Sequence, residues 1–308
     1  MRPHYIASIV FVAIFVGCST SLKDPVVPVA NTYYLHEGVR IHFKDVGKGR
    51  TIVFIHGFGA SLDSWRFMVE AFKDEYRLVL LDLKGHGYSD RPRDSRYSVR
   101  DQAEIVIGLL EHLGVSNVVL VGHSFGSVVA LLVALKARES SPGIVSGLFL
   151  IAGSVDADNL PFVLRLLRTP VIGWLGMKLT SASFRTRLAL KKAYYDDEKI
   201  TDSVVELYAK YQNIPGTDYA FLKTAEQLVP SNFSDLRQDL RRLQNPVINI
   251  LGDQDEIVQR VSAESVCKLL SRCLLVTLED VGHVPHEETP EKIVPILRDF
   301  MQTHQLPN

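Results

Sequence analysis

The residues best suited to covalent chemistry lie in the stretch GHSFG at positions 122–126. This stretch follows the apolar run VVLV and precedes the long apolar stretch SVVALLVALKA, so a strand should turn sharply into a helix at Ser124. Glycines on both sides of the serine allow such a turn, and a helix amino terminus places partial positive charge where an oxyanion would form. The pattern predicts that Ser124 is the nucleophile of an acyl-transfer reaction.

A serine hydroxyl at neutral pH needs a base within hydrogen-bond reach, and that base needs an acid to orient it. His283 follows the apolar run LLVTL and Asp255 follows VINIL, so both should lie in loops at the carboxyl ends of strands, as Ser124 does. The rival candidates are four other carboxylates and one histidine: Asp253, Glu256, Asp156, Asp158 and His286. The pattern therefore predicts His283 as the base and leaves the acid open.

The segment HGFG at residues 56–59 follows another apolar run, TIVFI. Acyl transfer creates a negatively charged oxygen, and two backbone N–H groups usually bind it, each contributing roughly 3–4 kcal/mol. We expect one N–H from Phe125, directly after the nucleophile, and the other from Phe58 in this loop. Taken alone, HGFG could be no more than a tight glycine turn, and the GHSFG stretch downstream favours the oxyanion interpretation.

Short apolar runs alternate with helical stretches and would position these loops. Strands are expected at residues 33–35, 39–45, 51–55, 78–81, 118–121, 148–151, 247–251 and 274–278, the first two as a hairpin. Helices are expected at about residues 64–73, 98–113, 125–136, 262–271 and 290–304. Runs this apolar are typical of strands buried on both faces, so the pattern predicts an α/β fold with a mostly parallel twisted sheet and helices on both faces. Residues 154–235 break the alternation and predict a helical insertion.

These motifs resemble those of the α/β-hydrolase fold superfamily, in its capped serine hydrolase type, over residues 33–303. The stretch DLKGHGYS at residues 82–89 is similar to the family's structural D-x-x-G-x-G-x-S turn, and GHVPHEETPE resembles the family ending around the catalytic histidine. The family's spacing of a glycine, two residues and the catalytic Asp implies Asp255 as the acid. The resemblance also implies that the core comprises two parts joined by a cap. These parts are core residues 33–153, cap residues 154–235 and core residues 236–308.

The resemblance further implies a hydrolase that cleaves a small, apolar carboxylic ester through an acyl-enzyme on Ser124, with no metal or other cofactor. Epoxide hydrolases and dehalogenases of this family carry Asp at the nucleophile position, which excludes them. Carbon–carbon bond hydrolases extend the oxyanion loop with Pro-Gly-Ala and an Asn, and residues 58–63 lack both features. That reaction, lactone or amide hydrolysis, and a non-catalytic binding role remain alternatives. The aromatic and aliphatic content of the cap indicates an apolar pocket, although such residues also bury a cap against its core.

The amino-terminal segment has the layout of a secretory signal. Residues 5–17 are apolar and uncharged, and this stretch is short for a membrane span of ~20 residues. The sequence FVGCS resembles the lipobox of bacterial lipoproteins, with Phe where Leu is usual. The resemblance implies a signal peptide at residues 1–17, lipidation of Cys18 and a tether at residues 18–32, on the periplasmic side of an outer membrane. An uncleaved signal anchor and cleavage without lipid are the alternatives.

Net charge limits the kinds of binding partner to expect, and the cysteine content limits the possible disulfides. The 308 residues include 34 Lys and Arg against 35 Asp and Glu, a formal net charge of -1. That balance gives no electrostatic reason to expect a nucleic-acid partner, and no protein partner is indicated. The remaining cysteines, Cys267 and Cys273, can pair only if their Cα atoms lie within ~4.4–6.8 Å, so a disulfide and two free thiols both remain open.

Overall fold

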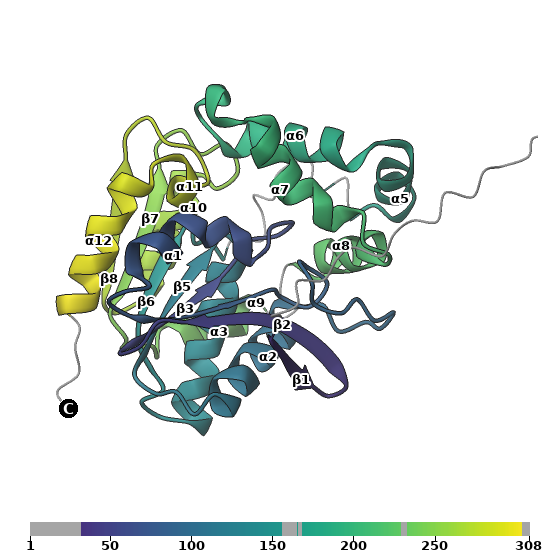
Figure 1. The fold of residues 1–308 in the computed structure, drawn as a ribbon. Helices are drawn as coiled ribbons and strands as arrows, with labels where there is room; N and C mark the ends of the chain where they lie inside the picture. The colour runs from purple at the N-terminus through teal and green to yellow at the C-terminus, as the bar shows by residue number, and fades with distance from the viewer. Residues whose placement is uncertain (1–31, 156–164, 166–167, 229–232, 304–308) are drawn as a thin grey trace, which may run out of the picture.

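The computed structural model describes residues 32–155, 165, 168–228 and 233–303. Within these ranges, eight strands form one sheet in the order β1-β2-β4-β3-β5-β6-β7-β8 (Figure 1). The strands are β1 Thr32–His36, β2 Val39–Val46, β3 Thr51–Ile55, β4 Arg77–Leu81, β5 Val118–His123, β6 Val145–Ile151, β7 Val247–Gly252 and β8 Cys273–Leu278. Strand β2 is antiparallel to both β1 and β4, and the other neighbours are parallel. The predicted α/β class and amino-terminal hairpin are confirmed.

Helices cover both faces of the sheet because successive strand residues point to opposite sides. On β3, Val53 and Ile55 pack with α2 (Val99–His112), α3 (Phe125–Ser140) and α10 (Arg260–Leu269). The alternate residues Ile52 and Phe54 pack with α1 (Arg66–Phe72) and α12 (Pro290–Thr303). The apolar core therefore has two layers, one on each side of a sheet whose central strands are buried.

In the described residues from 168 onward, several α-helices follow β6, largely within the part of the chain predicted to be helical. They are α5 Pro170–Leu179, α6 Ala182–Ala193, α7 Asp202–Gln212, α8 Thr217–Glu226 and α9 Phe233–Leu240. Figure 1 shows α5 to α8 above one edge of the sheet. Helix α9 instead contributes Leu236 and Leu240 to the core layer that contains α3. We use the word cap for α5 to α8.

Cys267 on α10 and Cys273 at the start of β8 form a disulfide, with their Cα atoms 5.0 Å apart. The structure thus contains the bridge that the spacing alone left undecided. Among the described residues, no helix is both long enough and apolar enough to span a bilayer. The predicted signal segment and Cys18 lie outside the described residues.

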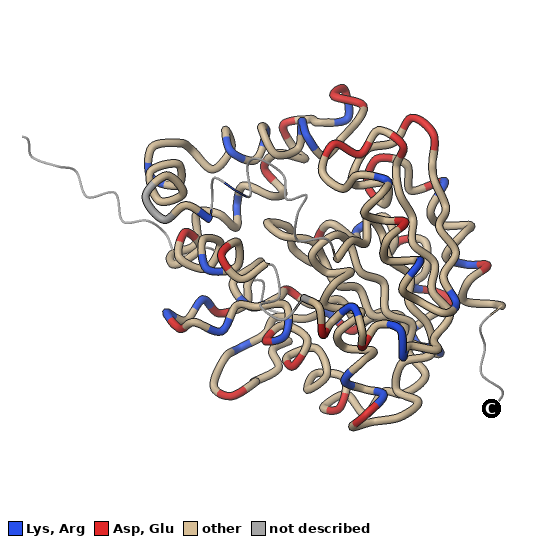
Figure 2. Tube along the Cα trace, turned by 180° about the vertical axis from the view of Figure 1, so that it is seen from behind, with Lys and Arg blue, Asp and Glu red and all other residues tan. Residues whose placement is uncertain are grey.

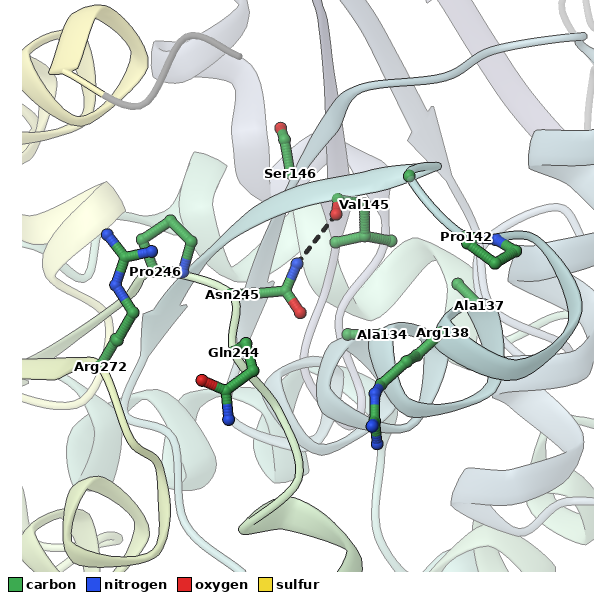
Figure 3. Close-up of a pocket in the computed structure, with 11 residues that line it drawn as sticks. Ala134, Ala137, Arg138, Pro142, Val145, Ser146, Gln244, Asn245, Pro246 and Arg272 are labelled. Carbon is green, nitrogen blue, oxygen red and sulfur yellow. Dashed lines mark hydrogen bonds between the residues drawn. The ribbon is translucent and has the colours of Figure 1, made fainter.

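A cavity of about 300 Å³ opens beside the first residues of β6 and the residues that precede β7 (Figure 3). Asn245 lines the cavity and donates a hydrogen bond to the backbone oxygen of Val145 at 2.8 Å. Arg138 and Arg272 lie at its sides. This cavity is at the amino ends of the strands, whereas Ser124, Asp255 and His283 follow the carboxyl ends, so it is separate from the predicted site.

Candidate active site

Ser124 lies at the sharp turn between β5 and α3 that the sequence predicted. Its backbone has a positive φ of 51° with ψ of -114°, and its N–H donates to the oxygen of Ile151 at 2.8 Å. A Cβ at Gly126 would lie 2.2 Å from the backbone oxygen of Ile55, and one at Gly122 would lie 2.5 Å from the oxygen of Gly126. Only residues without a side chain fit these two positions, because the turn is pressed against its own helix and against β3.

Asp255 and His283 come together from the loops that follow β7 and β8. His283 Nδ1 lies 2.8 Å from Asp255 Oδ2, and both side chains are almost fully buried. The other carboxylate oxygen, Asp255 Oδ1, accepts from the backbone N–H groups of Ile257 at 2.7 Å and Val258 at 2.8 Å. These bonds fix the carboxylate, and the carboxylate in turn fixes the imidazole with Nε2 available for proton transfer.

The loop of His283 is held against the Ser124 turn by the preceding residue, His123. The ring nitrogen Nε2 of His123 lies 2.9 Å from the backbone oxygen of His283, and the two ring centroids are 4.8 Å apart. Within the described residues, no hydrogen bond joins Ser124 Oγ directly to His283. Such bonds are often long without substrate and tighten only when it binds.

The rival acids and the rival histidine occupy other positions. Asp253 accepts from the N–H of Val281 at 3.4 Å, and Glu256 pairs with Lys192 at 2.6 Å on the surface. His286 is fully buried beside Trp65, and neither of its ring nitrogens has a hydrogen-bond partner. Burial, aided by the nearby Arg66 charge, lowers the pKa of His286 to about 3. Asp156 and Asp158 lie outside the described residues.

Phe58 lies in the loop after β3. Strand β3 pairs with β5, which leads through Ser124 to Phe125. His56 fixes this loop, because its Nδ1 lies 2.7 Å from the oxygen of Gly57 and its Nε2 accepts from the N–H of Leu83 at 3.0 Å. Burial lowers the pKa of His56. Phe125 is the first residue of α3, so its N–H belongs to the helix turn whose donors have no partner within the helix. Phe58 therefore lies on a loop and Phe125 at the start of a helix, both at the carboxyl edge of the sheet.

Asp82 organises the neighbouring turn that resembles the family's D-x-x-G-x-G-x-S motif. Its carboxylate lies 2.6 Å from His42 Nδ1 and accepts from the N–H groups of Leu62 and Tyr88, each at 2.8 Å. Burial alone would raise the pKa of Asp82, but His42, His56 and the N–H of Leu62 together outweigh it, and the net shift is downward. The two N–H bonds hold the backbone at Leu62 and Tyr88 in place, as expected of a structural turn.

Two glutamates for which the sequence predicted no role connect the cap to the His283 loop. Glu287 and Glu288 end the short helix α11 (Pro285–Glu288), and both are buried. Glu288 accepts from the N–H of Gly282 at 2.8 Å and from two N–H groups directly after α6, at residues 195 and 196. The N–H of His283 itself donates to the oxygen of Ala193, the last residue of α6, at 2.6 Å. The cap and the predicted base are thus joined by a continuous set of hydrogen bonds.

Glu287 collects three donors from elements that are distant in sequence. Its carboxylate accepts from Arg66 of α1 at 2.5 Å, from Tyr194 at 3.3 Å and from Tyr208 of α7. Burial raises the pKa of Glu287, and Arg66 opposes that shift. The signal available in the sequence was the pair of adjacent acids at positions 287 and 288, which begins four residues beyond His283. In the described ranges, no three His, Cys, Asp or Glu side chains are grouped so as to hold a metal ion.

The alpha/beta hydrolase fold family matches residues 50–290, and the chain belongs to this family. The chain is 28% identical over 270 residues to an uncharacterized hydrolase, YugF, of Bacillus subtilis, a match that covers 86% of this chain and 96% of that protein. It is 26% identical over 272 residues to 2-hydroxymuconate semialdehyde hydrolase of Pseudomonas putida, covering 87% and 92%. The chain is accordingly an enzyme of the hydrolase class, which sets aside the non-catalytic alternative.

Solved structures share the fold. A thermophilic esterase from Thermogutta terrifontis superposes with a TM-score of 0.75 at 22% identity, covering 89% of this chain and 99% of the esterase. A meta-cleavage product hydrolase from Pseudomonas fluorescens gives a TM-score of 0.75 at 23% identity, covering 89% and 98%. The two structures carry names for different reactions, so the shared fold does not select between them.

Proposed function

We propose that the chain is a serine hydrolase that cleaves a small, apolar carboxylic ester through an acyl-enzyme on Ser124. The observation that carries this proposal is the 2.8 Å hydrogen bond between buried Asp255 and His283, beside a serine at a positive-φ turn. A serine, an imidazole and an orienting carboxylate supply a nucleophile, a base and a means of stabilising the imidazolium.

In the proposed reaction, Ser124 Oγ attacks the ester carbonyl carbon while His283 Nε2 takes the hydroxyl proton. The carbonyl oxygen becomes negatively charged and accepts hydrogen bonds from the N–H groups of Phe58 and Phe125. The bond to the alcohol oxygen then breaks, and the alcohol leaves with the proton from His283. A water molecule repeats the attack on the acyl-enzyme, gives its proton to His283, and releases the carboxylic acid as Ser124 regains a proton.

An apolar substrate is supported by the surroundings of the oxyanion loop. The ring of Phe58 lies 5.3 Å from that of Phe221 on the cap helix α8, and Phe221 lies 5.1 Å from the ring of His86. Burial, followed by the nearby charge of His56, lowers the pKa of His86 to about 3, so this ring is neutral near pH 7. The cap therefore meets the loop through uncharged rings, which suits an uncharged acyl or alcohol group.

The Ser124→Ala variant tests the assignment. We expect turnover of p-nitrophenyl esters to fall by roughly 10⁴–10⁶-fold and covalent labelling by a fluorophosphonate probe to disappear. Ser140→Ala, at the exposed far end of the same helix, is the matched control and should retain both. Near-normal ester turnover by a folded Ser124→Ala protein would refute the proposed nucleophile.

Carbon–carbon bond hydrolysis is the second candidate, because the relative from Pseudomonas putida carries the name of such an enzyme. The same three side chains would serve that reaction, but the oxyanion loop lacks the Pro-Gly-Ala and Asn that the sequence analysis associated with it. A screen of ester, lactone, amide and vinylogous diketone substrates, with Ser124→Ala as the blank, separates the candidates. A kcat/KM for the diketone above that for every ester would reverse the order of preference.

We propose further that Cys18 carries a lipid that anchors the enzyme on the periplasmic side of a bacterial outer membrane. The support is the sequence alone: an apolar stretch at residues 5–17, then FVGCS, then a tether of residues 18–32. Two or more acyl chains anchor a protein stably, whereas one is marginal. Mass spectrometry of membrane-extracted protein should show an acylated Cys18 as the new amino terminus, and an intact Met1 or an unmodified start would contradict it.

A further inference from the structure

The outer side of the cap exposes an unusual amount of apolar surface. Seven of the twelve large apolar side chains that are exposed in the described residues lie between Ile172 and Tyr195. We use the term cap face for the six of them on α5 and α6: Ile172, Trp174, Leu175, Leu179, Phe184 and Leu188. Leu179 is 78% exposed, Phe184 60% and Trp174 52%. Large apolar side chains exposed in such number on two helices adjacent in sequence mark a candidate interaction site.

The cap face lies on helices that are packed on one side only. Helix α5 contacts α8, and α6 contacts α7, so α7 and α8 lie between these helices and the core (Figure 1). On α5, Gly173 and Met177 are buried, whereas residues 172, 174–176, 178 and 179 are exposed. The Arg185 guanidinium of α6 donates to the backbone oxygen of Met177 at 3.1 Å, which fixes α5 relative to α6. Arg185 thus links the two helices that carry the exposed side chains.

The charge of the same segment has one sign. Residues 160–195 contain no Asp or Glu, and they contain seven basic residues: Arg165, Arg168, Lys178, Arg185, Arg187, Lys191 and Lys192. Figure 2 shows the absence of acidic residues along α5 and α6. Four of the cations pair with acids on other elements: Lys178 with Asp218, Arg187 with Asp202, Lys191 with Asp197 and Lys192 with Glu256. Seven cations less four acids leave a local charge of +3 in a chain whose total is -1.

Apolar helices rich in Trp, Phe and Leu and flanked by Lys and Arg are typical of surfaces that lie in the boundary of an anionic bilayer. The described chain also begins on the same side as the cap. Thr32 pairs with Phe43, and Phe43 pairs with Leu81, the last residue of β4, so the chain enters the fold at the carboxyl edge of the sheet. Extended chain spans at most ~3.6 Å per residue, so the 14 residues from 18 to 31 can reach about 50 Å. An anchor at that end leaves the cap face free to reach the same membrane.

We propose that the cap face docks on an anionic phospholipid bilayer, with the apolar side chains of α5 and α6 entering the headgroup boundary and the surrounding cations meeting lipid phosphates. This contact is separate from any lipid on Cys18 and does not depend on the proposed ester chemistry. It would hold the cap, which borders the site through Phe221, against the membrane surface.

The protein carries its own reporter for this contact. The chain has two tryptophans, of which Trp65 is fully buried and Trp174 is 52% exposed on the cap face. The experiment uses the full-length Ser124→Ala chain, so that no lipid is hydrolysed, in vesicles with brominated acyl chains. We expect quenching of Trp174 in mixed phosphatidylglycerol and phosphatidylcholine vesicles, weaker quenching at high salt, and little in phosphatidylcholine alone. Trp174→Phe should remove the quenched signal.

Leu179→Glu, placed in the same chain, tests the contact with a single side chain. We expect the docked fraction to fall about tenfold, because an apolar anchor is lost and a negative charge faces the anionic lipid. Loss of one of the three cations that make up the local +3, as in Arg168→Gln, should weaken docking about fivefold. Leu274→Glu is the matched control, since Leu274 is 58% exposed on β8, outside the cap face, and should leave quenching unchanged. Thermal melts of each variant verify that it is folded.

Three results would overturn the proposal. The first is equal Trp174 quenching in anionic and neutral vesicles, and the second is quenching unchanged by Leu179→Glu. The third is protection of Trp174 from aqueous iodide before lipid is added. Such protection that rises with protein concentration would indicate a second copy on the cap face, and protection independent of concentration would indicate the chain's own apolar segment at residues 5–17.

Discussion

Glu287→Gln is the substitution that measures how firmly the cap is joined to the His283 loop. The carboxylate is fully buried and accepts from Arg66, Tyr194 and Tyr208. An amide has one acceptor oxygen in place of two, so one of the three donors must lose or reverse its hydrogen bond. Breaking a buried ion pair costs about 3–5 kcal/mol, but the Arg66 side chain remains 30% exposed and water partly solvates it. We therefore expect a loss of about 2–3 kcal/mol in the free energy of unfolding.

Urea unfolding of four proteins gives the coupling free energy between Glu287 and Tyr208 directly. These proteins are the wild type, Glu287→Gln, Tyr208→Phe and the double variant. A hydrogen bond to a charged group contributes about 1.5–3 kcal/mol, so Tyr208→Phe alone should cost about 1.5 kcal/mol. The double variant should be more stable than the sum predicts by about 1 kcal/mol, because both changes remove the same contact. Since α11 begins two residues after His283, we also expect kcat/KM for esters to fall about tenfold while fluorophosphonate labelling stays complete.

Glu256→Gln is the matched control for that experiment. Glu256 also joins the core to the cap, through Lys192 of α6, but both side chains are more than half exposed. Exposed pairs contribute ~0–1 kcal/mol, so this variant should change the free energy of unfolding by less than about 0.5 kcal/mol. The proposed fastening of the cap by Glu287 would be refuted if the two glutamine variants were equally stable, or if the Glu287 and Tyr208 changes were additive within about 0.3 kcal/mol.

Two further outcomes follow from close contacts and burial. Gly126→Ala would place a Cβ 2.2 Å from the backbone oxygen of Ile55, so we expect it to lower the free energy of unfolding by more than about 3 kcal/mol in chemical denaturation. A Cβ at Gly176 of α5 would meet nothing within 4 Å, so Gly176→Ala should instead raise the free energy of unfolding by about 0.5–1 kcal/mol. Burial lowers the pKa of His86 and of His286 to about 3, below the ~6.5 of an unfolded chain. Below pH ~6.5 the unfolded state binds more protons than the folded state, so the free energy of unfolding decreases as the pH falls. We expect a loss of about 2 kcal/mol for each histidine at about pH 5. Urea unfolding that gives the same free energy from about pH 7.5 to 5 would contradict this expectation.

Most strand positions could be predicted because buried parallel strands are continuous apolar runs. The bounds of β3, Thr51–Ile55, agree with the prediction to the residue. The first half of β6 was missed, since Ser146 and Gly147 interrupt the apolar run. In the structure Ser146 Oγ donates to the oxygen of Val118 on the neighbouring strand at 3.0 Å, which satisfies a buried hydroxyl. A polar residue inside a strand is tolerated when a neighbour far along the chain bonds to it, and the local pattern does not contain that neighbour.

A residue of the site could likewise be predicted when its partners are close in sequence, and not when they are far along the chain. Ser124 could be predicted because the glycines that its turn requires are adjacent in sequence. Glu287 could not, because two acids after a proline are ordinarily a solvated turn, and its partners come from α1, the end of α6 and α7. The disulfide between Cys267 and Cys273 was undecided for a related reason. The spacing allows many Cα distances, and only the turn from α10 into β8 sets the value of 5.0 Å.

Histidine content alone would not have identified the base, because several histidines are buried at this edge of the sheet. Burial lowers the pKa of four of them: His56, His86, His123 and His286. A ring in that state does not take up a proton near pH 7, so these four act as neutral packing and hydrogen-bonding groups. His42 has a carboxylate partner in Asp82, but His42 lies on β2, which β4 and β3 separate from β5, and the Asp82 carboxylate also holds the backbone N–H groups of Leu62 and Tyr88. His283 combines a carboxylate partner with a loop bonded to the residue before Ser124, and this combination makes it the candidate base.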